Sequence, residues 1–336
     1  MTIHIFNPET DYALALGRKQ YSPPASIVNL RRKMALTPAR FANENDAILL
    51  LDDITDKELS RTQEFDTLER KGLRIVRIND LNRFITNVTE NGGDIKIRPW
   101  GWNHSLRRIL INAGVSPDLL KSEEEIDILR MLAHRHTTIP FQEKLSSLLP
   151  DLQIPIAHEF KSLAEAMEFA THHTSVYFKA PWSSSGRGVV CTGSFSKQEI
   201  ESWIKGCLRR QGSVMGEIGF DRSADFATEW ICHNGHAEFV GLSLFKTSST
   251  GKYLGNEIMS QQEINSYIFS LSPFWDEKII DAQREALMEI IAPFYDGPAG
   301  IDMFSTTGNH INPCVEINLR QTMGLAAFLQ SQEHIR

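Results

Sequence analysis

Near the C-terminus, two carboxylates and an amide have types and spacing that suit a divalent cation. Asp302 lies within one apolar run, while Glu316, Asn318 and Arg320 alternate with apolar residues in the next. In a strand, Glu316 and Asn318 leave the backbone on one face, and Arg320 joins them if the strand continues. Mg²⁺ takes one or two carboxylates and completes its shell with phosphate and water oxygens. The sequence therefore predicts a magnesium site on two adjacent strands, although the polar face of an exposed hairpin explains either strand alone.

Lys179 comes just before a segment of small residues that suits the binding of phosphate groups. A lysine at the end of a strand places its ammonium on nucleotide phosphates, and glycine lets backbone N–H groups approach them without obstruction by a Cβ atom. The spacing fits neither the GxxxxGK[ST] nor the GxGxxG motif, and a plain hairpin tip is an equal alternative. The residues of this predicted phosphate site are Lys179, Ser183, Ser184, Ser185, Gly186, Arg187 and Gly188.

A third segment, Glu217 and Ile218, follows where the middle of the chain gives way to its last third. Extended backbone at such a hinge can pair with the edge of an adenine ring, and an acidic side chain further along can hold a ribose hydroxyl. Asp225 is the candidate for the ribose, with Asp221 behind it. These residues complete a predicted nucleotide site.

The first 128 residues are predicted to form an α/β unit with a largely parallel sheet, because short apolar runs alternate with polar helical stretches. Ser122 and Glu125 have the spacing of a capping box, which predicts a helix from there to about His134 and places the end of the unit in this stretch. The predicted strands are Thr2–Phe6, Ala47–Leu51, Leu73–Ile78 and Ile95–Ile97.

Two α+β units are predicted to follow, over residues 129–213 and 214–336. Ser162 with Glu165 and Ser196 with Glu199 predict two more capped helices. Gly308 suits the turn of a final hairpin. The predicted strands are Val176–Lys179, Val189–Thr192, Ser213–Glu217, Asp225–Cys232, Ala237–Phe245, Gly300–Ser305 and Asn309–Asn318, and the predicted helix among them is Asp276–Ile291.

The composition excludes several classes of protein. The chain has 336 residues, of which 41% are hydrophobic and 23% charged, as in globular rather than disordered proteins. Its net charge of -7 excludes a large basic surface, so no nucleic-acid partner is expected. The cysteines are scattered without a CxxC pair, which indicates reduced thiols. No apolar run approaches the roughly 20 residues of a membrane span and no signal-peptide pattern occurs, so the cytoplasm is the expected compartment.

The order of these motifs resembles that of the ATP-grasp superfamily over about residues 129–325. The resemblance implies that ATP lies between two α+β units and that the first 128 residues form a Rossmann-like preceding domain. For the nucleotide, it implies that Lys179 binds phosphate and that the segment from Ser183 to Gly188 covers the phosphates. It also implies that Glu217 and Ile218 meet the adenine and that Asp225 holds the ribose.

For the reaction, the resemblance implies that Asp302, Glu316 and Asn318 bind the metal and that Arg320 stabilises an acyl-phosphate.

The sequence departs from the family pattern in two places. Where the family usually has a lysine in its central domain, this chain offers Arg130 or Arg135, and Arg135 is the candidate for the phosphate contact. Extra residues between the hinge and Asp225 also put the ribose assignment in question.

The resemblance implies an ATP- and Mg²⁺-dependent ligase that joins a small-molecule carboxylate to an amine or a similar nucleophile. An ATP-grasp kinase that phosphorylates an alcohol, or an ATP-binding protein without turnover, is the alternative. The oligomeric state stays open, with a homodimer as one option. Asn7, Glu9, Asp11 and the segment from Trp100 to Trp102 follow predicted strands and suit either a substrate contact or a structural turn.

Overall fold

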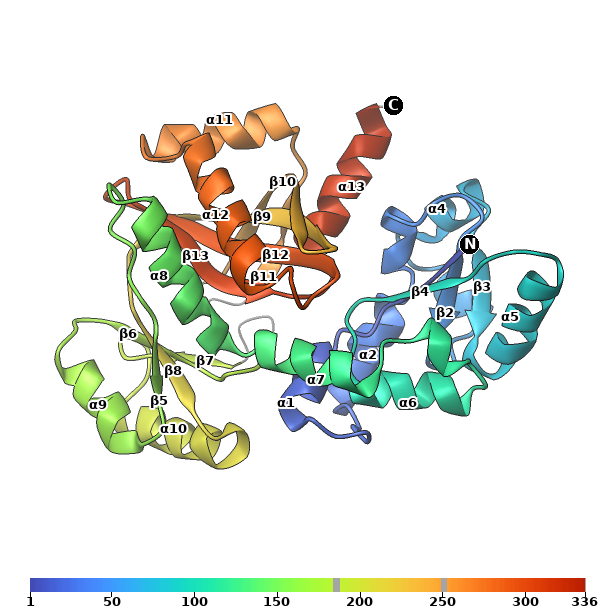
Figure 1. Cartoon of the computed structure of the whole chain (residues 1–336), viewed down its shortest axis with the longest axis horizontal. Coiled ribbons are helices and arrows are strands. Elements are labelled where there is room, and N and C mark those ends of the chain that lie inside the picture. The colour runs from blue at the N-terminus through green and yellow to red at the C-terminus, as the bar shows by residue number, and fades with distance from the viewer. Residues whose placement is uncertain (184–187, 249–252, 336) are drawn as a thin grey trace. The chain divides into compact units, whose positions relative to one another are not determined.

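A computed structural model of the protein describes residues 1–183, 188–248 and 253–335, with side chains to residue 332. The chain forms two compact units, one of Met1–Asp127 with the last residues of the chain and one of Ile128–Ser331. Each unit has its own sheets and covering helices (Figure 1). Among the described helices, none is both long and apolar enough to span a membrane.

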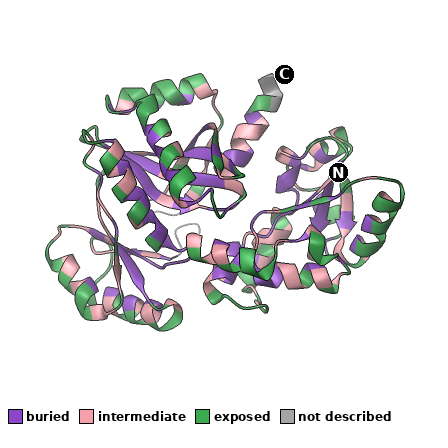
Figure 2. Cartoon of the chain, in the orientation of Figure 1, coloured by how far each residue is buried: buried purple, intermediate pink, exposed green. Residues whose placement is uncertain are grey.

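The first unit is built on a parallel sheet of four strands in the order β3-β2-β1-β4. Ile3 in the central strand lies opposite Ala47 on one side and Ile97 on the other. The two central strands are largely buried while the helices expose their outer faces (Figure 2), as expected for a parallel sheet covered by helices. The strands are β1 (Thr2–Ile5), β2 (Ala47–Leu50), β3 (Arg74–Arg77) and β4 (Lys96–Pro99), so the four predicted strands are confirmed.

Helices and 3₁₀ turns connect these strands. The helices are α1 (Thr10–Leu16), α2 (Ala25–Lys33), α3 (Asp56–Leu59), α4 (Phe65–Arg70), α5 (Leu81–Glu90) and α6 (His104–Asn112), and the 3₁₀ turns are η1 (Thr37–Arg40), η2 (Ile78–Asp80) and η3 (Pro117–Leu119). Helix α7 (Glu123–Leu132) leads into the second unit, and its predicted capping box is present, since Glu125 and Ser122 exchange backbone and side-chain hydrogen bonds.

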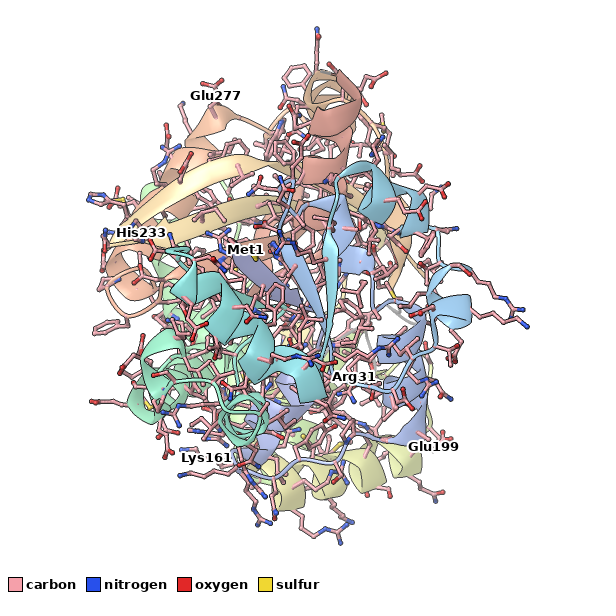
Figure 3. All side chains as sticks on the ribbon, turned by 90° about the vertical axis from the view of Figure 1, so that its right-hand side faces the viewer. Met1, Arg31, Lys161, Glu199, His233 and Glu277 are labelled. Carbon is pink, nitrogen blue, oxygen red and sulfur yellow. The ribbon has the colours of Figure 1, made fainter. Side chains whose placement is uncertain are left out.

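A buried ion network lies in the first unit, after the first two strands. Arg31 on α2, labelled in Figure 3, donates to Glu9 at 2.5 Å and with two nitrogens to Asp52 at 2.7 Å. Asn7 is fully buried and exchanges two hydrogen bonds with the backbone of Gly101. These side chains therefore have structural partners within the unit.

The second unit contains two sheets, and the smaller one has the order β5-β8-β6-β7. Helices α9 and α10 pack against it, with Phe178 and Ile204 fully buried between them. The capping boxes of Ser162 and Ser196 are confirmed. The elements are β5 (His158–Phe160), α9 (Leu163–Thr171), β6 (Val176–Lys179), β7 (Val189–Cys191), α10 (Lys197–Gln211) and β8 (Val214–Ile218).

The larger sheet is antiparallel, with the order β11-β10-β9-β12-β13. Helices α8, α11 and α12 pack on it (Figure 1). The strands are β9 (Arg222–His233), β10 (His236–Thr247), β11 (Tyr253–Glu257), β12 (Gly297–Thr306) and β13 (Ile311–Asn318). The other elements are η4 (Arg135–Thr137), α8 (Thr138–Leu148), α11 (Gln261–Leu271), α12 (Glu277–Ile290) and α13 (Met323–Ile335).

The larger sheet differs from the sequence prediction in three respects. Strand β11 and helices α11 and α13 were not predicted. The turn of the last hairpin contains Gly308 as predicted, but the residue with a left-handed backbone is Asn309, which has φ 64°, because asparagine also tolerates this region. Strand β13 starts at Ile311, two residues later than predicted, and ends at Asn318, so Arg320 lies beyond it.

Candidate active site

A cleft of about 900 Å³ lies in the second unit, and both sheets of that unit contribute to its lining. The smaller sheet contributes Lys179 and its neighbours, and the larger sheet contributes several acidic residues. The predicted site residues that line the cleft are Arg135, Lys179, Asp225, Asp302, Glu316, Asn318 and Arg320. Predicted phosphate and metal residues from distant parts of the sequence thus share one cavity.

Lys179 ends strand β6 and is almost completely buried. Its ammonium donates to Glu217 on the adjacent strand β8 at 2.5 Å. Glu217 and Ile218 do not themselves line the cleft, although the sequence predicted that they meet the adenine. In this structure, Glu217 contacts Lys179 instead: it neutralises the charge of the lysine and fixes the position of its ammonium group at the cleft.

Arg135 in η4 connects the segment after β6 with strand β13. Its guanidinium donates to Ser183 Oγ at 2.7 Å and to Glu316 Oε1 at 2.6 Å, across 181 residues of sequence. Arg130 instead lies 4.4 Å over the ring of Trp182 and does not line the cleft. Of the two arginines that the sequence offered, Arg135 is therefore the one at the cleft.

Gly188 lies against Ser183 at the base of the predicted phosphate segment. A Cβ atom on Gly188 would lie 2.4 Å from both Cβ and Oγ of Ser183, so only glycine permits this approach. The carbonyl of Gly188 accepts from the N–H of Ala180 at 2.8 Å, which closes the base of the segment. Ser184, Ser185, Gly186 and Arg187 lie outside the described residues.

Asp302 and Glu316 lie directly opposite each other on β12 and β13, and Asn318 is two residues along. Burial first, and then the charges of Glu316 and Glu229, raise the pKa of Asp302. Burial acts in the same direction on Glu316, but the charge and hydrogen bond of Arg135 outweigh it and lower the pKa of that group. The two facing carboxylates thus differ because only one of them has a buried arginine.

This oxygen set fits Mg²⁺. Like-charged carboxylates in one site favour a cation between them. Among the described residues, no three His, Cys, Asp or Glu side chains are grouped to hold a metal. Two carboxylates and an amide leave positions for phosphate and water, as Mg²⁺ requires.

Arg320 reaches the cleft from beyond the end of β13. Its Nη2 donates to Asn318 Oδ1 at 2.8 Å. Its positive charge acts to lower the pKa of Asp302. The sequence predicted that Arg320 would share a face with Glu316 if the strand continued. The strand ends at Asn318, and Arg320 lies after it but in the same cleft.

Asp225, the predicted ribose acid, lies on β9 and lines the cleft. One of its oxygens accepts from Thr247 Oγ1 at 2.5 Å and the other from Arg222 at 3.0 Å. The same Arg222 guanidinium lies 4.4 Å over the ring of Phe304. A ribose hydroxyl at Asp225 would therefore share an oxygen that already has a protein donor.

Comparisons with known proteins identify the architecture. No protein-family model and no curated protein matches the sequence. Among solved structures, an ATP-analogue complex of biotin carboxylase from Campylobacter jejuni has a TM-score of 0.54 at 12% identity, over 98% of this chain and 69% of that one. The biotin carboxylase domain of 2-oxoglutarate carboxylase from Hydrogenobacter thermophilus, a complex with MgADP and bicarbonate, has a TM-score of 0.50 at 10% identity, over 98% and 68%. The chain has the ATP-grasp fold.

The likeness confirms the fold that the motif order predicted. It covers nearly the whole chain, so it includes the parallel sheet of the first unit as well as the two sheets of the second. At such low identity it shows architecture alone, and the chemistry has to be argued from the side chains.

The ATP-grasp cleft also contains a residue that the sequence interpretation missed. Glu229 on β9 is 1% exposed and lines the cleft. Its oxygens accept from Ser243 Oγ and Thr322 Oγ1, each at 2.7 Å. Burial raises its pKa to about 7, against the opposing effect of these two hydrogen bonds. The signal in the sequence was its spacing of four residues from Asp225, which puts both on one face of a strand.

Proposed function

We propose that this protein is an ATP- and Mg²⁺-dependent ligase that activates a small carboxylate as an acyl-phosphate and joins it to an amine. The observation that carries the proposal is the convergence of Lys179, Arg135 and Arg320 with Asp302, Glu316 and Asn318 in one cleft. Three cations next to a hard oxygen set suit a magnesium nucleotide. The structures with similar architecture are themselves complexes with an ATP analogue and with MgADP, which supports the choice of nucleotide.

In the proposed reaction, a carboxylate oxygen of the acid attacks the γ-phosphorus of ATP, and the bond to the β–γ bridging oxygen breaks to release ADP. The amine then attacks the carbonyl carbon, phosphate leaves and the nitrogen loses one proton. Phosphoryl transfer of this kind depends mainly on positioning and electrostatic stabilisation. Lys179 and Arg320 would stabilise the charge on the transferred group, and no covalent protein nucleophile is needed.

Asp302, Glu316 and Asn318 would hold the magnesium ion, which neutralises phosphate charge when bound. Nucleotide phosphates at the same place would compete with Glu316 for the guanidinium of Arg135, which is now 2.6 Å from that carboxylate. We therefore propose that Arg135 exchanges Glu316 for phosphate when MgATP binds. This exchange would release Glu316 for the metal.

The test uses carboxylic acids labelled with ¹⁸O in the carboxylate. The purified protein is incubated with MgATP, pools of labelled acids and pools of amines, and the products are analysed by mass spectrometry. An acyl-phosphate route transfers one ¹⁸O atom to the released phosphate and gives an amide. A phosphorylated alcohol without free phosphate would replace the ligase by the kinase alternative, and bound but unconsumed ATP would indicate a binding protein.

Lys179→Ala supplies the matching control for the nucleotide site. MgATP should raise the melting temperature of the wild type but have little effect on this variant, because the buried ammonium that meets the phosphates is gone. Equal protection of both proteins would remove Lys179 from the site.

A further inference from the structure

We infer that Glu229 binds the amine substrate as a primary ammonium ion at the floor of the cleft, and that this nitrogen releases one proton to water before it attacks as the neutral amine. This inference rests on the proposed ligase function, and it adds the residue that binds the amine and limits that amine to a primary one. Glu229 is not one of the residues that the sequence predicted to bind phosphate, ribose or metal.

The Glu229 carboxyl group is fixed at both oxygens. Ser243 on β10 donates to Oε1, and Thr322, just before α13, donates to Oε2. A carboxylate has about four acceptor positions, so two hydroxyl donors leave lone pairs on both oxygens. Thr322 is itself held, because its hydroxyl accepts from the N–H of Leu325 at 2.9 Å. The carboxyl group is thus rigid and can still accept hydrogen bonds.

Two glycines pack their backbone against this carboxyl group. A Cβ atom on Gly324 would lie 2.0 Å from Glu229 Oε1, and one on Gly300 would lie 3.1 Å from Oε2. These two sides of the carboxyl group are therefore filled by protein. Room for a small ligand group is on the side of Glu229 that lines the 900 Å³ cleft.

The charges around Glu229 favour a cation. Among the described residues, no lysine, arginine or histidine forms an ion pair with Glu229, while Asp302 is close enough for the Glu229 charge to raise its pKa. Arg320 is the cation that acts on Glu229, and it also acts on Asp302. A carboxylate substrate would be repelled here, whereas an ammonium group supplies both a charge and three N–H donors.

Magnesium is a poorer occupant of this position than an ammonium group. Mg²⁺ demands close octahedral coordination, and the hydroxyl donors of Ser243 and Thr322 already turn their hydrogens toward the Glu229 oxygens. The facing pair Asp302 and Glu316 offers the better metal site. The two acidic groups of the cleft therefore serve different ligands.

The experiment measures amine binding to the protein saturated with Mg²⁺ and a non-hydrolysable ATP analogue. The probes are the twenty common amino acids, methylamine, ethanolamine and putrescine, each beside its N-acetyl derivative. At least one free amine should raise the melting temperature of the wild type, and its N-acetyl derivative should not. Calorimetry should show at least tenfold weaker binding of that amine to Glu229→Gln, and unchanged binding to Glu238→Gln, an exposed glutamate on β10.

Several outcomes would overturn the inference. They are the absence of any amine effect in the wild type, equal effects of free and acetylated amines, and full amine binding by Glu229→Gln. Loss of nucleotide protection in Glu229→Gln would also overturn it, because that result indicates a structural role. If Glu229→Gln does not fold, Glu229→Asp keeps the charge but withdraws it by one methylene, and unchanged amine affinity in that variant rejects the inference.

A measurement with the ATP analogue alone distinguishes failure of this inference from failure of the proposed function. If the ATP analogue fails to protect the wild type before any amine is added, the ATP-dependent function itself fails. If the analogue protects and amines do not bind, only the role of Glu229 is wrong.

Discussion

The two units treat buried charge in different ways. In the first, Arg31 holds Glu9 at 2.5 Å and Asp52 at 2.7 Å, so the ion network is completed within the fold. In the cleft of the second, Glu316 has Arg135, but no ion pair to Asp302 or Glu229 is found in the part of the chain that the structure describes. A buried charge without an oppositely charged partner is unfavourable unless a ligand supplies that charge. The network around Arg31 therefore stabilises the fold, whereas the acidic groups of the cleft are suited to bind cationic ligands.

Arg31→Ala should give the largest effect on folding. The change leaves the buried carboxylate of Glu9 and the half-buried one of Asp52 without this cation, and breaking a buried ion pair typically costs about 3–5 kcal/mol. Urea titration would measure the loss, and hydrogen exchange of peptides from β1 and β2 would place it in the first unit. Arg83→Ala removes an exposed arginine paired with Asp80 and should change stability by less than about 1 kcal/mol. Equal losses of stability in the two variants would show that the Arg31 network does not stabilise the fold more than an exposed ion pair does.

Asp302→Asn should impair the reaction and spare the fold. Loss of a preorganised charge at the reacting phosphate typically lowers turnover about 100- to 1000-fold. Stability without ligand should not fall, because the variant removes one of several like charges in the cleft. ADP release at varied Mg²⁺ and a melting curve give the two measurements, with Asp281→Asn, on the exposed side of α12, as the control. A large loss of stability without loss of turnover would make Asp302 a structural residue.

Glu229→Gln should change how ligand-free stability depends on pH. The pKa of Glu229 rises from an ordinary 4.5 to about 7 in the folded protein. Between these values the unfolded chain releases the proton and the folded chain keeps it, so wild-type stability falls as pH rises. One pKa unit corresponds to about 1.4 kcal/mol, so this shift contributes at most about 3–4 kcal/mol of stability. The contribution is fully present below pH 4.5 and is lost above pH 7.

The measurement is the free energy of unfolding at several pH values between 4 and 8. Glu229→Gln should gain stability relative to the wild type as the pH rises, because glutamine carries no charge to desolvate. A parallel pH dependence in both proteins would show that Glu229 does not keep its proton in the folded state.

Local patterns in the sequence were sufficient to predict the scaffold. The capping boxes at Ser162 and Ser196 depend on residues three apart, and the structure confirms both. Strand β2 is a buried apolar run, apolar residues alternate with polar ones in β1 and β4, and β3 has two apolar residues between arginines, which are patterns that sequence alone reveals. Strand β11 and helix α13 were missed because their hydrophobic periodicity is weak, so tertiary packing decides their conformation.

Side-chain partners at the cleft could not be predicted from local patterns. Arg135 was expected at a phosphate, and its contact with Glu316 joins positions 181 residues apart. Glu229 was overlooked because its partners Ser243 and Thr322 come from other elements. The residue types and their alternation predicted which side chains share a strand face, whereas the assignment of each cation to its anion needed the fold.

Lys246→Ala should give the smallest effect, although Lys246 also lines the cleft and forms an ion pair, with Glu257. The lysine side chain is 72% exposed, so water screens the pair and its removal should leave stability almost unchanged. Urea titrations of wild type and variant at low salt and at 1 M salt would measure it, and the small difference should vanish at high salt. A loss as large as that of Arg31→Ala would mean that burial does not decide which charge pairs matter in this protein.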